Sequence, residues 1–359
     1  MAGLADDGYG NPSGLHGVSQ RAKNALEAAR ERAGELIGAA HPLEIVFTGG
    51  GTEADNLAVA GTALAGGRRG GVVTVATEHD AVLATARFLA GLGCPVAIVP
   101  VDGLGRVDPA AIAAAVTPET AVVSVMTANN ETGVLQPVSA VADAIAESAP
   151  QVPVHTDAVQ AFIAEPITVD RLGASLISLA AHKFGGPKGV GMLYVRNGIE
   201  LEPVLHGGGQ ELGRRSGTHN VAGIVGMVAA MEATVADRDG YRRRVGAARD
   251  GFETRLRTQV PDVVVNAPPE LRLPQHSHVR IPGVGAETLL IRLDQEGIAA
   301  AAGSACHSGA IDASHVLAAM GMSQEHAAEC VRFSFGWVTE PGDGPFAADI
   351  VGKIVDELR

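Results

Sequence analysis

Short apolar runs alternate with longer amphipathic stretches between residues 44 and 195. The runs are EIVF, VVTVA, VAIVPV, VVSVM, VPVHTD, ISLAA and MLYV, and Gly, Pro or polar residues bound most of them. Such runs, rich in Val and Ile, are typical of buried strands. Stretches such as AVLATARFLAGLG separate them and carry apolar residues at helical spacing. Repeated strand–helix units predict an α/β fold with a mostly parallel sheet between helices.

A second, smaller α/β pattern begins near residue 263. It contains the strand-like runs VVV, HSHVRI and CVRFS, the helical stretches ETLLIRLDQEG and HVLAAM, and a terminal helix. A long, mainly helical stretch precedes it, and its triplet RRR is expected to be a solvated face. We therefore predict a large domain over residues 1–235 and a small C-terminal domain over residues 236–359.

Polar residues stand at or just past the ends of the predicted strands. They are His79, Asn129, Asn130, Asp157, Gln160, His182 and Lys183. In an open parallel sheet, ligands bind beyond the carboxyl ends of the strands. Each residue alone has an ordinary explanation, such as a turn, a helix cap or a wet rim. Their convergence on one predicted edge favours a functional site.

Lys183 lies in the turn HKFGGPKG, between two strand-like runs. A Lys at the end of a buried strand is costly unless its charge is paired or its pKa falls. A lowered pKa makes the amine nucleophilic, as a Schiff base with an aldehyde cofactor requires. The alternative is that Lys183 and Lys188 solubilise a hairpin, and the turn alone does not decide between the two.

A glycine-rich turn leads from the run EIVF into a helix with the sequence TGGGTEADNLAVAG. The pattern predicts Thr52 as N-cap, with Asp55 at the capping-box position. Free N–H groups and the helix dipole at such a place bind anions, phosphate in particular. The absence of a following GKS or GKT excludes a P-loop. Taken by itself, this stretch is better explained as an ordinary strand-to-helix turn.

Composition narrows the classes of function. The 359 residues are 46% hydrophobic, and the formal charge of −13 argues against a nucleic-acid partner. No apolar run approaches the ~18–20 residues that span a bilayer, so we expect no membrane partner. The first ten residues carry two acids and no apolar core, which argues against a secretory signal.

The cysteines and histidines indicate the cellular compartment and whether a metal site is expected. Cys94, Cys306 and Cys330 are odd in number and far apart, which indicates a reduced, cytoplasmic protein without a disulfide framework. His276 and His278 alternate on a predicted strand, a spacing that usually binds no metal. We therefore predict no metal site.

The motifs taken in chain order resemble one known family. They are GNPSG, IVFTGGGTEADNLA, TEHDAVL, NNETGVLQP, HTDAVQ, AHKFGGPKGVG, HGGGQELGRRSGT, GSACHSGAIDASHVL and VRFSFG. The series resembles the class V aminotransferases of pyridoxal phosphate (PLP) fold type I, and more closely the NifS/IscS-type, group I cysteine desulfurases. The resemblance covers nearly the whole chain. It implies a homodimeric, PLP-dependent enzyme that converts L-cysteine to L-alanine.

The resemblance also implies roles for the residues around the reacting atoms. Lys183 would hold PLP as a Schiff base and move the substrate Cα proton. Asp157 would pair with the pyridinium nitrogen and keep it protonated, which makes the ring an electron sink. His79 would stack on the ring face and could serve in proton transfer. Gln160 would hydrogen-bond the ring hydroxyl, and Asn130 would lie near the cofactor and the substrate.

Binding roles follow from the same resemblance. Gly51, Thr52 and His182 would hold the cofactor phosphate, in agreement with the predicted helix start. Thr218, in the motif RRSGT, would reach the phosphate of the other subunit, which makes a homodimer necessary. Arg332 would bind the substrate carboxylate with a two-pronged contact.

Cys306 lies in the small-residue stretch AAAAGSACHSGAIDAS. A buried structural cysteine is the ordinary interpretation. The flanking Gly and Ser residues and the adjacent His307 favour a nucleophile instead. By resemblance, the Cys306 thiolate takes the substrate sulfur as a persulfide, and the long loop that follows indicates the group I enzymes. Cys94 and Cys330 are expected to be packing residues.

The sequence departs from the family pattern in three places. Family members usually carry a strand and an Ala-Thr-Thr turn before GNPS, whereas this sequence starts just short of GNPSG. That difference predicts a misassigned start or a more open substrate pocket. Ala180 stands where many members have a phosphate-binding Ser, and His307 replaces a small residue.

Several partners and functions stay open at this point. The sulfur acceptor would be an iron–sulfur scaffold protein or a tRNA or cofactor thiolation protein. Another PLP-dependent C–S or C–Se lyase, similar to selenocysteine lyase, would share Lys183 and Asp157 without needing Cys306. A non-catalytic sulfur-relay relative is a further alternative. A nucleotide-binding enzyme is permitted by the glycine-rich turn, but no ribose- or base-reading motif accompanies it.

Overall fold

A computed structural model describes residues 9–303 and 314–359. Contacts within the chain group these residues into two compact units. Unit 1 holds the described residues up to Val99 together with Asp108–Thr127 and Pro137–Ala236. Unit 2 holds Pro100–Val107, Ala128–Gln136 and the described residues from Asp237 to Arg359. The domain division predicted after residue 235 stays a prediction, and two short segments before that residue group with unit 2.

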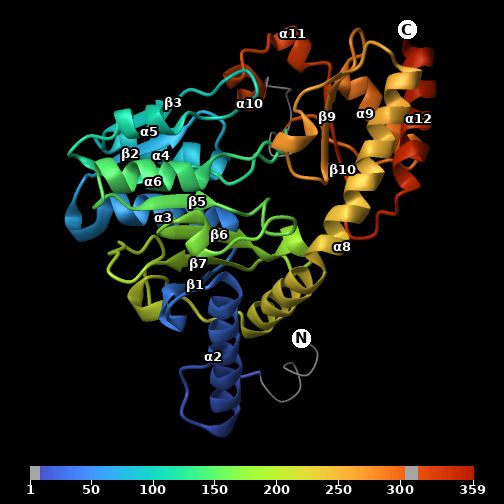
Figure 1. The fold of residues 1–359 in the computed structure, drawn as a ribbon. Coiled ribbons are helices and arrows are strands. Elements are labelled where there is room, and N and C mark those ends of the chain that lie inside the picture. The colour runs from blue at the N-terminus through green and yellow to red at the C-terminus, as the bar shows by residue number, and fades with distance from the viewer. Residues whose placement is uncertain (1–8, 304–313) are drawn as a thin grey trace. The chain divides into compact units, whose positions relative to one another are not determined.

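A seven-stranded sheet forms the centre of unit 1 (Figure 1). Its strands are β1 (Ile45–Thr48), β2 (Gly71–Val75), β3 (Val96–Val99), β4 (Thr120–Ser124), β5 (Val154–Asp157), β6 (Leu176–Ala180) and β7 (Gly191–Val195). The order across the sheet is β1-β7-β6-β5-β4-β2-β3. Only β7 runs against its neighbours, and the pairs among β2 to β6 are parallel. The predicted mostly parallel sheet is confirmed.

The apolar runs of the sequence form strands because both faces of this sheet are covered. Every residue of β1, β2, β5, β6 and β7 is buried. Parallel strands covered on both faces read as continuous apolar runs rather than as alternating ones. The helices of unit 1 are α2 (Gly17–Ile37), α3 (Gly51–Leu64), α4 (Asp80–Gly91), α5 (Pro109–Ala115), α6 (Val138–Ser148), α7 (Val169–Leu172) and the start of α8 (Val221–Gln259).

Helix α3 is the central helix of unit 1. It contacts strands β1, β2 and β4 to β7, and most of its residues are buried. Leu57 and Val59 belong to the same apolar cluster as Val72 of β2, Leu176 of β6 and Leu193 of β7. A helix that is apolar on most sides is stable only inside a protein. Its first turn is therefore held firmly at the edge of the sheet.

Unit 2 contains a three-stranded antiparallel sheet in the order β10-β9-β8. The strands are β8 (Val264–Val265), β9 (His276–Arg280) and β10 (Cys330–Ser334). The helices are the second half of α8 with α9 (Ala286–Gln295), α10 (His315–Ala319), α11 (Gln324–Ala327) and α12 (Asp343–Leu358). Three aromatic rings form part of the core, with Phe252 4.6 Å from Phe333 and 5.9 Å from Phe335 between ring centroids. The predicted second α/β pattern is confirmed.

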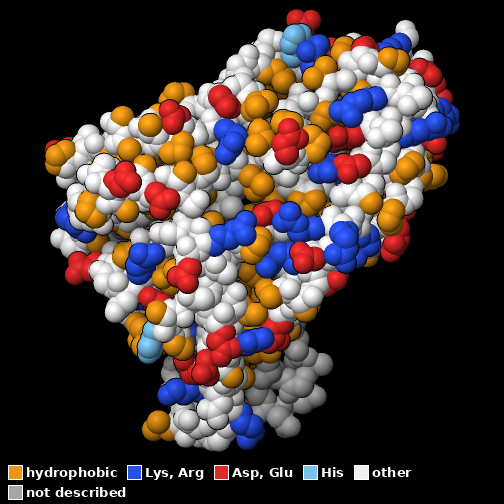
Figure 2. Space-filling view, viewed as in Figure 1, with side chains coloured by type: hydrophobic (Ala, Val, Ile, Leu, Met, Phe, Trp, Pro, Cys, Tyr) orange, Lys and Arg blue, Asp and Glu red, His pale blue; other side chains and the backbone are white. Residues whose placement is uncertain are grey.

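Short 3-10 helices complete the described elements. They are η1 (Pro42–Glu44), η2 (Ala65–Gly67), η3 (Ala181–Phe184), η4 (Glu211–Gly213) and η5 (Pro269–Leu271). Charged side chains of both signs are mixed with scattered apolar ones on the face shown in Figure 2, as on ordinary water-exposed protein surfaces. Among the residues described, we find no helix of the length and apolarity that crossing a bilayer needs.

Candidate active site

The first turn of α3 forms an uncapped helix start directly after β1. Its N-cap is Gly50, and no side chain accepts a hydrogen bond from the first turn within the described residues. The prediction of Thr52 as N-cap with Asp55 in a capping box is therefore wrong. Asp55 is 1% exposed and its carboxylate lies beside buried groups of the sheet. The N–H groups of the first turn are thus left for an external acceptor, which an anion at a helix N-terminus supplies.

Glycines let this turn lie directly against the sheet. A Cβ added at Gly51 would be 2.9 Å from Cγ2 of Val159 and 3.3 Å from Cβ of Ala180. A Cβ at Gly191 of β7 would be 2.7 Å from the carbonyl carbon of Gly50. The main chain, without side chains, therefore forms the floor of the site. This arrangement suits a group bound through main-chain N–H donors.

A cavity of about 770 Å³ opens at this turn. Its lining includes Gly51, Thr52, His182 and Lys188. The acidic side chain at its edge, Glu53, is paired with Arg215 at 2.7 Å and accepts the Gly49 N–H at 2.9 Å. The pKa of His182 is lowered by partial burial and by the charges of Lys183 and Lys188. The cavity thus combines basic groups with helix N–H donors, which suits a phosphate.

Asp157 ends strand β5 and is 6% exposed. Its Oδ1 accepts the Val159 N–H at 2.8 Å, and its main-chain oxygen accepts the Thr127 N–H at 2.8 Å. Burial raises the pKa of Asp157, while the Val159 hydrogen bond and the charges of His79 and Lys183 act in the opposite direction. The structure therefore brings Asp157, His79 and Lys183 into electrostatic contact within unit 1.

Lys183 lies in η3, the short 3-10 helix after β6. Ala181 and Phe184 are buried, whereas His182 and Lys183 are exposed. Residues three apart lie on the same side of a 3-10 helix, so η3 buries its two apolar members and directs the two basic ones outward. The expectation that Lys183 bears the cost of a buried strand end is therefore wrong. Its electrostatic partner is Asp157 on the neighbouring strand.

His79 is the N-cap of α4. Its Nδ1 accepts the Ala81 N–H at 3.1 Å, so the proton of the neutral imidazole is on Nε2. The capping contact orients the ring at the carboxyl end of β2. Gln160 follows β5 in the turn after Asp157 and is half-buried. The predicted residues His79, Asp157, Gln160, His182 and Lys183 thus follow the ends of β2, β5 and β6.

Two further buried carboxyl groups lie near Asp157, and we did not predict them as site residues. Glu78 is 0% exposed and accepts the Met126 N–H at 2.6 Å. The pKa values of Asp55 and Glu78 are both raised well above the usual carboxyl range. Burial is the larger cause in each case, and the nearby charge of Asp157 is the second. The sequence held no clear indication of this burial, because Asp55 lies among the polar residues Thr52, Glu53 and Asn56. A buried cluster of carboxyls beside a site is typical of a functional centre.

The buried side chain of His155 connects several elements of unit 1 through a row of polar contacts. His155 is 0% exposed, its Nδ1 lies 2.9 Å from Ser124 Oγ, and its Nε2 lies 2.9 Å from Ser178 Oγ. The Nε2 also lies 3.6 Å from Asp55 Oδ1. Burial lowers the pKa of His155 to about 3, so the ring is neutral at physiological pH. The row joins β4, β5, β6 and α3.

Unit 2 carries both residues predicted to bind substrate. Arg332 of β10 donates from Nη1 to the main-chain oxygen of Asn130 at 2.7 Å. The neighbouring Asn129 shapes that turn, because its Oδ1 accepts the N–H groups of Glu131 and Thr132 at 2.9 Å each. Asn129 is therefore a turn residue, whereas Asn130 and Arg332 are held together.

The two flanks of the cysteine segment are also fixed within unit 2. Ala301 pairs with Arg332 through two main-chain hydrogen bonds of 2.7 and 3.1 Å. Ser314 Oγ donates to Glu131 Oε2 at 2.5 Å. Cys306 and His307 themselves lie outside the described residues. The predictions made for these two residues stay predictions.

A family model, aminotransferase class V, matches residues 2–343. The chain belongs to this family. Its relatives include the cysteine desulfurase IscS of Dictyoglomus turgidum, 40% identical over 352 residues, or 98% of this chain and 89% of the relative. The cysteine desulfurase NifS of Azotobacter vinelandii is 40% identical over 351 residues, or 98% of this chain and 87% of the relative.

Solved structures agree with this class V assignment. A NifS-like protein superposes with a TM-score of 0.91 at 33% identity, covering 99% of this chain and 94% of that one. The protein SspA in complex with cysteine superposes with a TM-score of 0.79 at 32% identity, covering 92% of each chain. The resemblance to NifS/IscS-type proteins and to PLP fold type I, inferred from the motifs, is confirmed.

Ala180, which differs from the family pattern, and the predicted packing residues Cys94 and Cys330 all lie in the described part of the chain. Ala180 is fully buried, and its methyl group faces Gly51, which lines the cavity of about 770 Å³. Cys94 and Cys330 are free and buried, as expected of packing residues. Burial raises the pKa of Cys94, and it raises the pKa of Cys330 to about 11, so neither position suits a reactive thiolate.

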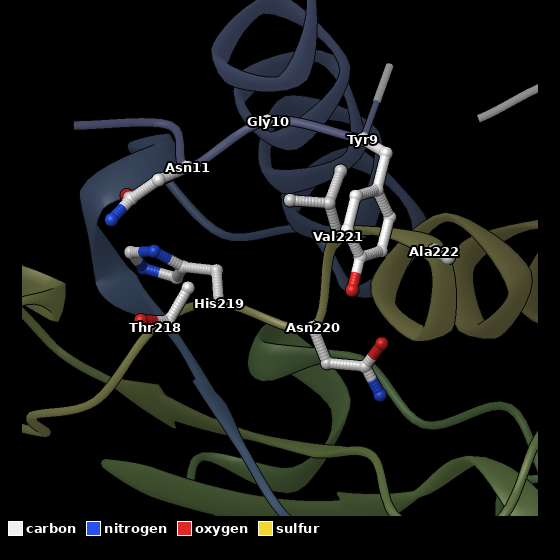
Figure 3. A pocket seen from close by; sticks show the side chains of 8 residues that line it. All are labelled: Tyr9, Gly10, Asn11, Thr218, His219, Asn220, Val221 and Ala222. Atoms are coloured by element: carbon white, nitrogen blue, oxygen red, sulfur yellow. The ribbon is translucent and has the colours of Figure 1, made fainter. Parts of the chain in front are cut away.

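Thr218 lies on the segment before α8 and its side chain is exposed. It lines a separate cavity of about 370 Å³ with Tyr9, Asn11, His219 and Asn220 among the other lining residues. Figure 3 shows Asn11, His219 and Thr218 gathered on one side of this cavity and Tyr9 and Asn220 on the other. In the described part of the chain, no group of three or more His, Cys, Asp or Glu could hold a metal ion.

Proposed function

We propose that this protein is a cysteine desulfurase that uses PLP to convert L-cysteine to L-alanine and holds the sulfur as a persulfide on Cys306. The observation that carries the proposal is the position of Lys183 and Asp157 at the ends of adjacent strands, in electrostatic contact and beside an uncapped helix start. An amine, a buried carboxyl and a phosphate cradle are the three contacts that PLP needs. The names of the relatives support the same reaction.

The residues present fit the cofactor. Gly51, Thr52 and His182 line the cavity at the α3 start and would hold its phosphate. Asp157 would face the ring nitrogen, with His79 near the ring and Gln160 near its hydroxyl. When bound, PLP supplies an electron sink for the bonds broken at the substrate Cα. Gly51 has no side chain that could cover the main-chain N–H donors to the phosphate. A Cβ at this position would be 2.9 Å from Cγ2 of Val159.

The chain's own residues would carry the remaining chemistry. The Lys183 amine takes the proton from the substrate Cα and returns a proton later. Arg332 would bind the substrate carboxylate, and its hydrogen bond to the main-chain oxygen of Asn130 supports a role for both residues in substrate binding. The Cys306 thiolate forms an S–S bond with the substrate sulfur while the substrate C–S bond breaks. The electron pair of that bond stays with the carbon skeleton, which takes up a proton and leaves as alanine.

The proposal includes a homodimer in the cytoplasm, with Thr218 of each subunit reaching the phosphate of the other. The sulfur acceptor would be a protein, either an iron–sulfur scaffold or a component of tRNA or cofactor thiolation. The formal charge of −13 supports a protein rather than a nucleic acid as the direct acceptor.

A visible absorbance spectrum tests the proposal. We expect the purified protein, supplied with PLP, to be yellow, to change its spectrum with L-cysteine and to form alanine. Lys183→Ala should abolish the cofactor band that depends on the amine. Lys23→Ala is the control, because this exposed lysine of α2 does not line the cavity at the α3 start and should leave the band unchanged. A protein that PLP cannot colour, or that forms no alanine, contradicts the proposal.

A further inference from the structure

The segment 205–219, which we call the Thr218 segment, leads to α8 and contains one deeply buried acid. The side chain of Glu211 is 1% exposed and that of its partner Arg30 is 7% exposed. The acid belongs to the motif HGGGQELGRRSGT, and no role in the reaction was predicted for it. A buried carboxylate on a loop is unusual, because charged groups leave water only when they are paired.

Glu211 is held by a two-pronged ion pair with helix α2. Arg30 Nη1 donates to Glu211 Oε2 at 2.7 Å, and Arg30 Nη2 donates to Oε1 at 2.8 Å. The Phe47 N–H of β1 donates to Oε2 at 3.2 Å. Arg30 is itself fixed, because Nη1 also donates to the Ile45 oxygen at 2.6 Å. The Thr218 segment is thus attached to both α2 and β1 through one carboxylate.

The main chain at this place has an unfavourable conformation. Glu211 has φ +50° and Leu212 has φ +58°, and they are the two non-glycine residues with positive φ among those described. Such backbone persists only where the surroundings impose it, and it gathers at functional sites. Leu212 is 65% exposed, so its own packing does not impose the turn. The buried Glu211 carboxylate does.

The same turn fixes both neighbours of Thr218. The Gly217 N–H donates to Oε1 of Gln210, the residue before Glu211, at 2.8 Å. His219 Nε2 lies 2.8 Å from Glu211 Oε1. Thr218, which has an exposed side chain, is therefore bounded on each side by a residue that the 210–211 turn holds.

We propose that Glu211 is a positioning residue that sets the place of Thr218, through the Arg30 pair on one side and His219 on the other. The inference rests on the proposed function in one respect, namely that Thr218 contacts the cofactor phosphate. Glu211 itself touches neither cofactor nor substrate in this role. It acts by making one conformation of the Thr218 segment the stable one.

A double-mutant cycle on cofactor affinity tests this role. PLP is titrated into the apoprotein of the wild type, Glu211→Gln, Thr218→Ala and the double variant, and the cofactor absorbance gives each Kd. We expect each single change to raise the Kd about tenfold, as for the loss of a hydrogen bond to a charged group. In the Thr218→Ala background, Glu211→Gln should cause no further rise. A further tenfold rise would mean independent effects and would overturn the proposal.

The control and the second variant keep the outcome clear. Glu232→Gln makes the same change in an exposed pair with Arg32 of the same helix α2, and it should leave the Kd unchanged. If Glu211→Gln does not fold, Arg30→Lys keeps the charge but loses the fork, and it enters the same cycle. A wild-type Kd for Thr218→Ala overturns the positioning role, whereas a wild-type protein that binds no PLP contradicts the proposed function itself.

Discussion

Arg332 and Asn130, 202 positions apart in sequence, are joined by a hydrogen bond of 2.7 Å from the guanidinium to a main-chain oxygen. The contact fixes one edge of the guanidinium, so its planar fork has a defined orientation. Asn129 in turn shapes the loop that supplies the acceptor. The clamp predicted for the substrate carboxylate is thus oriented before substrate binds.

Arg332→Lys should therefore weaken substrate binding more than it slows the chemical step. A lysine ammonium cannot reproduce the fork, and the loss of one charge-assisted contact is worth about 1.5–3 kcal/mol. We expect KM for L-cysteine to rise roughly ten- to hundredfold with a smaller change in kcat. Arg280→Lys, on the neighbouring strand β9, removes a guanidinium that pairs with Glu329 through Nε and should leave KM unchanged. An unchanged KM in Arg332→Lys would contradict the clamp.

Cys306→Ala should keep the cofactor and its spectral response to L-cysteine but form no protein persulfide. The reason is that the variant lacks the thiolate that accepts the sulfur, while the residues proposed to bind PLP stay in place. The measurement is persulfide detection by mass spectrometry, together with alanine release. Cys94→Ala, which changes a buried packing cysteine, is the control and should behave as the wild type does. Persulfide or full turnover in Cys306→Ala would move the function toward a lyase without a cysteine nucleophile.

Thr218 should act across the subunit interface of a homodimer. Thr218→Ala alone is expected to lose PLP faster on dilution. Mixing it with Lys183→Ala subunits should restore one site with wild-type retention, because the intact Lys183 then receives Thr218 from the other subunit. Retention is measured on the isolated mixed dimer. No recovery would place the Thr218 contact within its own subunit.

The stability of the fold should fall in acid because of His155. Its pKa of about 3 in the folded protein lies below the unfolded value of about 6.5, so the unfolded chain binds the extra proton. The contribution is fully present above about pH 6.5 and declines as pH falls toward 3, by up to roughly 4–5 kcal/mol in the free energy of unfolding.

Urea unfolding of the variant His155→Gln measures how much the protonation of His155 contributes to the free energy of unfolding. The variant should be less stable than the wild type at pH 7, because it weakens the contacts with Ser124 and Ser178. The difference in free energy of unfolding between the wild type and the variant should narrow from pH 6.5 to pH 4. Only the wild type loses stability through His155 over this range, because Gln does not titrate. A constant difference over that range would show that His155 does not change its protonation on unfolding.

The local sequence pattern alone predicted much of the fold and part of the candidate site. The apolar runs bounded by Gly and Pro predicted the strands, and the alternation with helical stretches predicted a mostly parallel sheet. Because parallel strands end at one edge, the same pattern placed His79, Asp157 and Lys183 together. The motifs in chain order indicated the family. These features depend on residues close in sequence, and periodicity reports them directly.

Other features needed the tertiary structure, because they depend on contacts between distant residues. The sequence favoured Thr52 as the cap of α3, but the packing of Gly50 against Gly191 and the burial of Asp55 leave that helix uncapped. It also placed Lys183 in a buried setting, whereas η3 turns the side chain outward. The buried pair of Glu211 with Arg30 joins residues 181 positions apart. Periodicity carries no information about contacts between residues so far apart in sequence. Only the folded chain therefore decides which polar groups are capped, buried or paired.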